Sequence, residues 1–154
     1  MAGCSQRADI ERPMRYVEVV NGNETWFEYG LRMRSTYPEN DGSTVARVGT
    51  PLSLRVCVDV RRDPQRAPQC IHVFCWTNIR TDDNPCGIWK EIHLPLNPSV
   101  SSPVDGYEDL LQYVYEGSLV PSASDSYRLT FLLKWNHILL WHNGFMDDGF
   151  VDVI

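Results

Sequence analysis

Two segments of the sequence alternate apolar and polar side chains at every second position, and this period constrains the fold more than any other feature. From Leu52 to Val60 the even-numbered residues are all aliphatic, and from Tyr127 to Trp135 the odd-numbered residues are all aromatic or aliphatic. Successive side chains of a β-strand point to opposite faces, so each segment predicts a strand with one buried face. The side chains that we expect in the core are Leu54, Val56, Val58, Phe131 and Leu133.

Shorter stretches have the same β-forming composition. They cover residues 26–33, 71–76, 88–96, 113–119, 138–141 and 150–154. A loop rich in proline and serine spans 97–103, and the composition of Tyr107–Gln112 predicts one helical turn capped by Asp105. Eight or nine short strands, separated by turn dipeptides such as Asn143-Gly144, are typical of two packed sheets. We therefore predict an all-β fold, an antiparallel immunoglobulin-like β-sandwich.

The length fits one domain, because 154 residues can enclose a single core but not two. Residues 1–13 are polar and show no period, so we expect a flexible N-terminal arm there and one β-sandwich domain over residues 14–154. The apolar runs are only a few residues long, which argues against a membrane-spanning helix and a membrane partner. The net charge of −6 argues against nucleic acid, whose binding depends on neutralising phosphates.

The cysteines are five in number, Cys4, Cys57, Cys70, Cys75 and Cys86. An odd, scattered set in a chain large enough to fold without cross-links predicts a reduced, cytoplasmic protein with no obligatory disulfide. The sequon Asn23-Glu24-Thr25 keeps secretion open as an alternative.

Residues that could carry catalysis or bind a metal are scattered along the chain. Cys70, His72, Cys75 and Cys86 resemble a zinc set only loosely, since alternation along a strand sends neighbouring side chains to opposite faces. Nothing in the sequence brings Cys75 and His93 together as a nucleophile and its base. We therefore expect no metal, no cofactor and no catalytic residue, and a non-catalytic role is favoured.

The aromatic residues are more informative, because Trp and Tyr rings stack on sugar rings and their polar edges hydrogen-bond to hydroxyls. Most of the tryptophans lie in or beside strand patterns, which predicts the core for Trp76, Trp135 and at least one of Trp26 and Trp89. Trp141 is followed at once by His142-Asn143-Gly144, a loop-forming sequence. We therefore expect Trp141 to be solvent-exposed and to be the principal ligand contact, with burial against the core as its alternative.

The C-terminal half resembles a known family through a series of short motifs. In order, they are the segment 113–116, Gly117-Ser118-Leu119-Val120-Pro121, the strand 127–134, Leu140-Trp141-His142-Asn143-Gly144 and Asp148-Gly149-Phe150-Val151-Asp152-Val153. This order is similar to the end of starch- and glycogen-binding modules, most closely the family 21 type, and the resemblance covers roughly residues 50–154. It implies a non-catalytic module that binds an α-glucan, a polysaccharide or oligosaccharide.

The resemblance also implies the site residues. Trp141 would stack on the sugar and Asn143 would bond its hydroxyls, with Trp89 and Trp76 as second-site aromatics. Apart from the resemblance, the position of Asp147 in the segment after Trp141 predicts a further group that bonds hydroxyls. The sequence departs from the family at this loop, where His142 and one asparagine replace the usual Asp-Asn-Asn and residues 145–148 are inserted.

Two other functions fit the same residues. One is a protein-interaction or accessory domain without a sugar site, which predicts an apolar patch or a free sheet edge. The other is a small β-barrel enzyme or ligand carrier, which predicts an enclosed pocket lined by His72, His93 or tyrosines.

Overall fold

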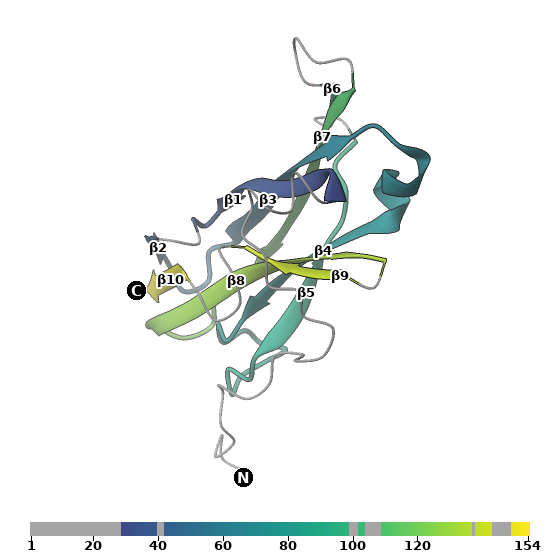
Figure 1. Ribbon diagram of the computed structural model, residues 1–154. Coiled ribbons are helices and arrows are strands. Elements are labelled where there is room, and N and C mark those ends of the chain that lie inside the picture. The colour runs from purple at the N-terminus through teal and green to yellow at the C-terminus, as the bar shows by residue number, and fades with distance from the viewer. Residues whose placement is uncertain (1–28, 40–41, 99–101, 104–108, 137, 143–148) are drawn as a thin grey trace.

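The computed structural model describes residues 29–39, 42–98, 102–103, 109–136, 138–142 and 149–154, and these form two β-sheets packed face to face (Figure 1). The first sheet has the order β1 (Leu31–Tyr37), β3 (Leu52–Arg61), β7 (Leu110–Leu119), β6 (Ser102–Pro103). The second has the order β2 (Ser43–Ala46), β10 (Gly149–Val153), β8 (Asp125–Trp135), β4 (Ile71–Thr77), β5 (Lys90–Leu94), with β9 (Ile138–Trp141) also paired to β8. The predicted immunoglobulin-like β-sandwich is confirmed.

The two strictly alternating segments form the centres of the two sheets. β3 lies between β1 and β7, and β8 is flanked by β4 on one side and by β9 and β10 on the other. The predicted core side chains, Leu54, Val56, Val58, Phe131 and Leu133, are all fully buried between the sheets. One face of each of these central strands packs against the opposite sheet, which is why their alternation in the sequence is so regular.

A hydrogen bond at the corner between β7 and β8 is typical of immunoglobulin-like sandwiches. The Tyr127 hydroxyl donates to the backbone carbonyl of Ala123, with 2.8 Å between the oxygens. Such a tyrosine corner fixes the chain where it passes from one sheet to the other. Leu129, two residues further on, is fully buried where antibody domains carry a disulfide cysteine, so apolar packing holds this part of the core.

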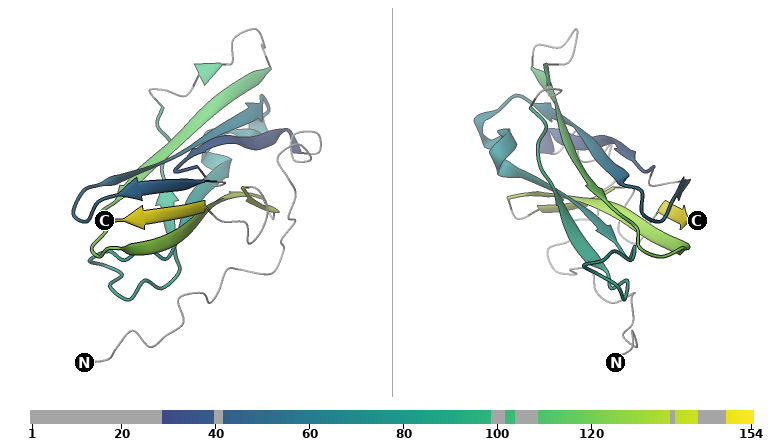
Figure 2. Two further views of the ribbon diagram at one scale, coloured as in Figure 1. Left: turned by 90° about the vertical axis from the view of Figure 1, so that its left-hand side faces the viewer. Right: turned by 180° about the vertical axis from the view of Figure 1, so that it is seen from behind.

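The chain changes sheets between its first two strands. β1 pairs with β3 in the first sheet, whereas β2 pairs in parallel with β10 in the second. The left view of Figure 2 shows β2 and β10 side by side next to the C-terminus. β2 therefore ends the second sheet as a short edge strand.

The outward faces of the two sheets differ in chemistry. On the first sheet, the half-exposed Arg32 and Arg34 lie 3.2 and 3.7 Å from the carboxylate of the buried Asp59. On the second sheet, the outward face carries a second apolar cluster, separate from the core. The first face is thus polar and the second is aromatic.

Several predicted boundaries were wrong. The predicted helical turn over Tyr107–Gln112 is not formed at Leu110–Gln112, because these residues begin β7 and pair with β3 and β6. The predicted loop 97–103 contains β6, and β2 was not predicted at all. The predicted arm, residues 1–13, lies outside the described residues, as do residues 14–28 of the predicted domain.

Candidate functional site

Three of the tryptophans that the sequence analysis selected do come together. Trp76 on β4, Trp141 on β9 and Trp89, just before β5, belong to one outer aromatic cluster. This cluster consists of Phe74, Trp76, Trp89, Leu132, Leu139 and Trp141. It lies on the outward face of the second sheet, because the alternate residues of β4 and β8, such as Cys75 and Leu133, face the core.

The predicted exposure of Trp141 is wrong, since only 2% of its surface is accessible. Trp141 is not a loop residue but the last residue of β9, directly opposite Leu132 of β8. Its ring lies 6.2 Å from that of Trp76, at an interplanar angle of 54°. Trp76 is itself only 9% exposed, so neither indole offers an open face for a sugar ring. Asn143 and Asp147, the predicted hydroxyl ligands, lie outside the described residues.

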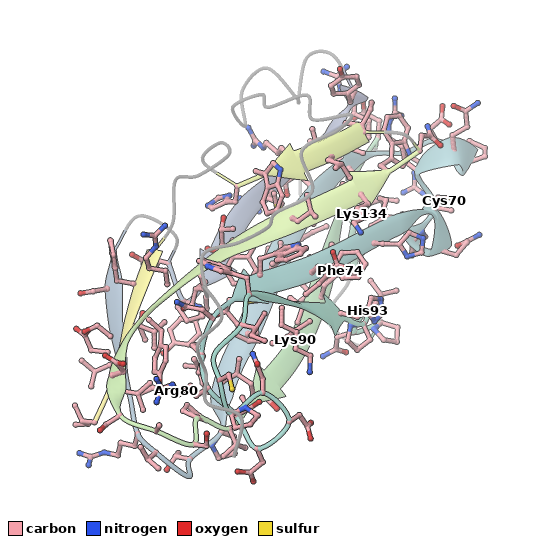
Figure 3. All side chains as sticks on the ribbon, turned by 90° about the horizontal axis from the view of Figure 1, so that it is seen from below. Cys70, Phe74, Arg80, Lys90, His93 and Lys134 are labelled. Carbon is pink, nitrogen blue, oxygen red and sulfur yellow. The ribbon has the colours of Figure 1, made fainter. Side chains whose placement is uncertain are left out.

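Cationic side chains cover the half-buried rim of the outer aromatic cluster. The Lys134 ammonium lies 4.5 Å from the centre of the Phe74 ring and 3.1 Å from a Glu91 carboxylate oxygen. Figure 3 shows Phe74, His93 and Lys134 on neighbouring strands of this face. At another part of the rim, the Arg128 guanidinium lies 6.0 Å from the centre of the Trp89 ring. Each of these two rings thus has a cation of the chain itself beside it.

The structure separates the residues that could have formed a catalytic pair. Cys75 is fully buried in the core, whereas His93 is exposed and packs against the Phe74 ring at 5.4 Å on the outward face. Burial raises the pKa of the Cys75 thiol, which disfavours the nucleophilic thiolate. Among the described residues, no group of three or more His, Cys, Asp and Glu side chains is arranged to hold a metal ion.

The expectation of fully reduced cysteines is wrong. Cys86 is disulfide-bonded, whereas Cys57, Cys70 and Cys75 are free thiols. The fifth cysteine, Cys4, lies outside the described residues. No helix in the described part of the chain is long and apolar enough to cross a membrane.

A cleft of about 470 Å³ opens at one end of the sandwich. Thr77, Asp82, Asp83, Lys90 and Ser118 contribute polar groups to its wall. His72 and His93, which were expected in a ligand pocket, do not line this cleft.

The exposed apolar side chains gather elsewhere, at the edge of the second sheet. Seven large apolar side chains of the described residues are exposed. Four of them lie on or just after β2 and β10, and a fifth, Tyr37 at the end of β1, lines one groove with Val45. We call these five the β2–β10 edge surface: Tyr37, Val45, Val48, Phe150 and Ile154, with exposures between 44% and 66%. Val48 and Ile154 are joined by a backbone hydrogen bond, which continues the strand pairing beyond β2.

A groove of about 290 Å³ runs along the same edge. It is lined by Val45, Ala46 and Arg47 on one side and by Tyr37 and residues 50–53 on the other. Alternate side chains of a strand point to opposite faces, so a groove that contacts consecutive residues follows the edge of the strand. Among the described strands, β2 pairs with β10 alone, and its other edge borders this groove.

Sequence reasoning missed these residues for a physical reason. Val45 belongs to a strand of four residues, which is too short to show a period. Phe150 lies on the predicted strand 150–154, but alternation alone does not show which face of that strand packs against the core and which is exposed. The combination of a free edge with exposed apolar side chains emerges only when β2 and β10, from near the two ends of the described chain, are brought together.

Comparison with known proteins adds a similarity in structure but none in sequence. No family model and no curated protein matches the chain. Among solved structures, the Lin-41 filamin domain is similar to this chain with a TM-score of 0.28 and 12% sequence identity, over 72% of this chain and 83% of that one.

Proposed function

We propose that this β-sandwich is a non-catalytic protein-interaction domain that binds its partner at the β2–β10 edge surface. The observation that carries the proposal is the gathering of exposed apolar side chains there, beside a strand whose second edge has no pairing strand among the described residues. Exposed apolar patches are typical of protein interfaces, and an unpaired strand edge is a template for another strand.

Two features of the edge support binding rather than avoidance of it. Proteins protect edge strands by short length, charge, proline or a bulge. β2 is short, with four residues, but its sequence Ser-Thr-Val-Ala contains neither a charged residue nor a proline. Val45 on β2 and Phe150 on β10 also point to the same outward side, because Val45 is opposite Asp152 in the parallel register. A partner strand would therefore meet backbone groups and apolar side chains together.

The predicted α-glucan binding remains a competing hypothesis. The buried state of Trp141 and Trp76 removes the aromatic platform on which that prediction depended. Tryptophan fluorescence distinguishes the two hypotheses. If the outer aromatic cluster binds sugar, adding soluble starch should change the fluorescence of its tryptophans. The proposed interaction domain predicts no change.

The experiment uses displayed random heptapeptides, selected on the whole protein and then synthesised for affinity measurements. Replacing Val45 and Phe150 by glutamine should weaken the selected peptides at least ten-fold, since both side chains leave the apolar surface. Ile88→Gln is the matched control, because Ile88 is 44% exposed and lies near β5, at the opposite edge of the sheet. Equal affinity for the double variant and wild type, with both folded by circular dichroism, would contradict the proposal.

A further inference from the structure

The groove beside β2 has a polarity that points to the chemistry of the partner. Its lining includes one cation, Arg47, and no acidic residue. Leu52 and the Tyr37 ring supply apolar wall, while Thr50 and Ser53 supply hydroxyls. A segment that fits this groove therefore needs an apolar side chain and an anionic group close to it.

We infer that the partner is an extended peptide segment that adds as a strand to the free edge of β2 and places a carboxylate against Arg47. This inference rests on the proposed interaction role and specifies the chemistry of the partner. Strand addition takes its affinity from backbone hydrogen bonds and its specificity from pockets for alternate side chains. The pocket here is the groove between β2 and the start of β3.

The length of β2 limits the size of the paired segment. The strand has four residues, which at about 3.3 Å per residue is roughly 13 Å of edge. Successive side chains of the added strand would face the outward side and the inward side in turn. One apolar side chain would then meet Val45 and Phe150, and the next would enter the groove near Leu52.

Arg47 is positioned to recognise a carboxylate at the end of this segment. It immediately follows β2 and is exposed. Among the described residues Arg47 forms no ion pair, whereas Arg55 on β3 pairs with Glu116. A guanidinium binds a carboxylate through two parallel N–H donors, which a lysine cannot reproduce. The pair would lie at the protein surface and would therefore contribute specificity more than affinity.

The test is a double-mutant cycle with a selected heptapeptide that contains glutamate. Changing that glutamate to glutamine, or Arg47→Gln in the protein, should each weaken binding about three- to five-fold. Combining the two changes should weaken binding no further, because both remove the same contact. Independent losses that multiply, or no loss from either change, would overturn the inference.

The same measurements separate this inference from the proposed function. If the Val45 and Phe150 variant loses binding while the cycle shows no coupling, the interaction surface stands and the carboxylate contact is wrong. If that variant binds every selected peptide as wild type does, the proposed function itself fails.

Discussion

The Tyr127 hydroxyl and the Ala123 carbonyl are 2.8 Å apart and join the end of the β7–β8 corner to the start of β8. The Tyr127 ring is buried, so the hydrogen bond satisfies a hydroxyl that enters the edge of the core. This contact couples the position of the corner to the packing of β8 between its neighbours.

Tyr127→Phe should therefore lower the free energy of unfolding by about 1 kcal/mol, because the carbonyl of Ala123 loses its donor while the ring packing is kept. Urea denaturation followed by circular dichroism measures the change. Tyr37→Phe is the control, since the Tyr37 ring is 47% exposed. An equal effect of the two substitutions would show that the corner hydrogen bond contributes nothing specific.

The protein should lose stability as the pH rises above about 9 to 10. Burial raises the pKa of the Cys75 thiol from 9.0 and that of the Tyr115 phenol from 10.0. The native state keeps these protons at a pH where the unfolded chain releases them, so alkali favours unfolding. Urea midpoints between pH 7 and 11 should fall, and the fall should be smaller in Tyr115→Phe. A flat profile would contradict the burial of these groups.

Tyr115→Phe should also be neutral or stabilising at pH 7. The Tyr115 hydroxyl is buried and has no hydrogen-bond partner among the described residues. Removing a buried hydroxyl without a partner removes its desolvation cost, which is of the order of 1 kcal/mol or more. A clear destabilisation at neutral pH would reveal a partner for this hydroxyl.

Trp141→Ala should destabilise the domain by about 3–5 kcal/mol, because it opens a cavity beside Trp76 and Leu132. Thermal or urea unfolding measures this loss. Trp89→Ala should cost less, since Trp89 is only half-buried at the rim of the same cluster. A stable Trp141→Ala variant would contradict the buried position of the indole.

Thiol titration tests the state of the cysteines. Denatured without reductant, the protein should react with a thiol reagent at Cys57, Cys70 and Cys75 but not at Cys86, which should react only after reduction. In the native state Cys70, which is half-buried, should react first and Cys75 should be protected. Five thiols before reduction would show that Cys86 carries no disulfide.

The sequence predicted the parts of the fold that have a strong local signal. The alternation around Val56 and Phe131 identified the central strands, because each has one face in a single core. Leu132 and Trp141 were harder to interpret, since the second sheet buries apolar side chains on both faces and alternation then no longer separates inside from outside. The loop sequence after Trp141 suggested exposure, but the pairing of β9 with β8 places this residue within the sheet.

The candidate interaction surface could not be predicted in the same way. Val45 and Phe150 are over a hundred positions apart in the sequence and become neighbours only through the parallel pairing of β2 with β10. Nothing local to either residue shows that their strands form the end of a sheet. The fold class was therefore accessible from the sequence, whereas the surface depended on the order of the strands.

Nuclear magnetic resonance mapping with a selected heptapeptide tests the central claim most directly. In a titration of the labelled whole protein, the account predicts the largest amide shifts at residues 43–48 and 149–154 and unchanged indole signals of Trp76, Trp89 and Trp141. Shifts centred on the outer aromatic cluster, or on the cleft lined by Thr77 and Lys90, would contradict the assignment of the interaction surface to the β2–β10 edge.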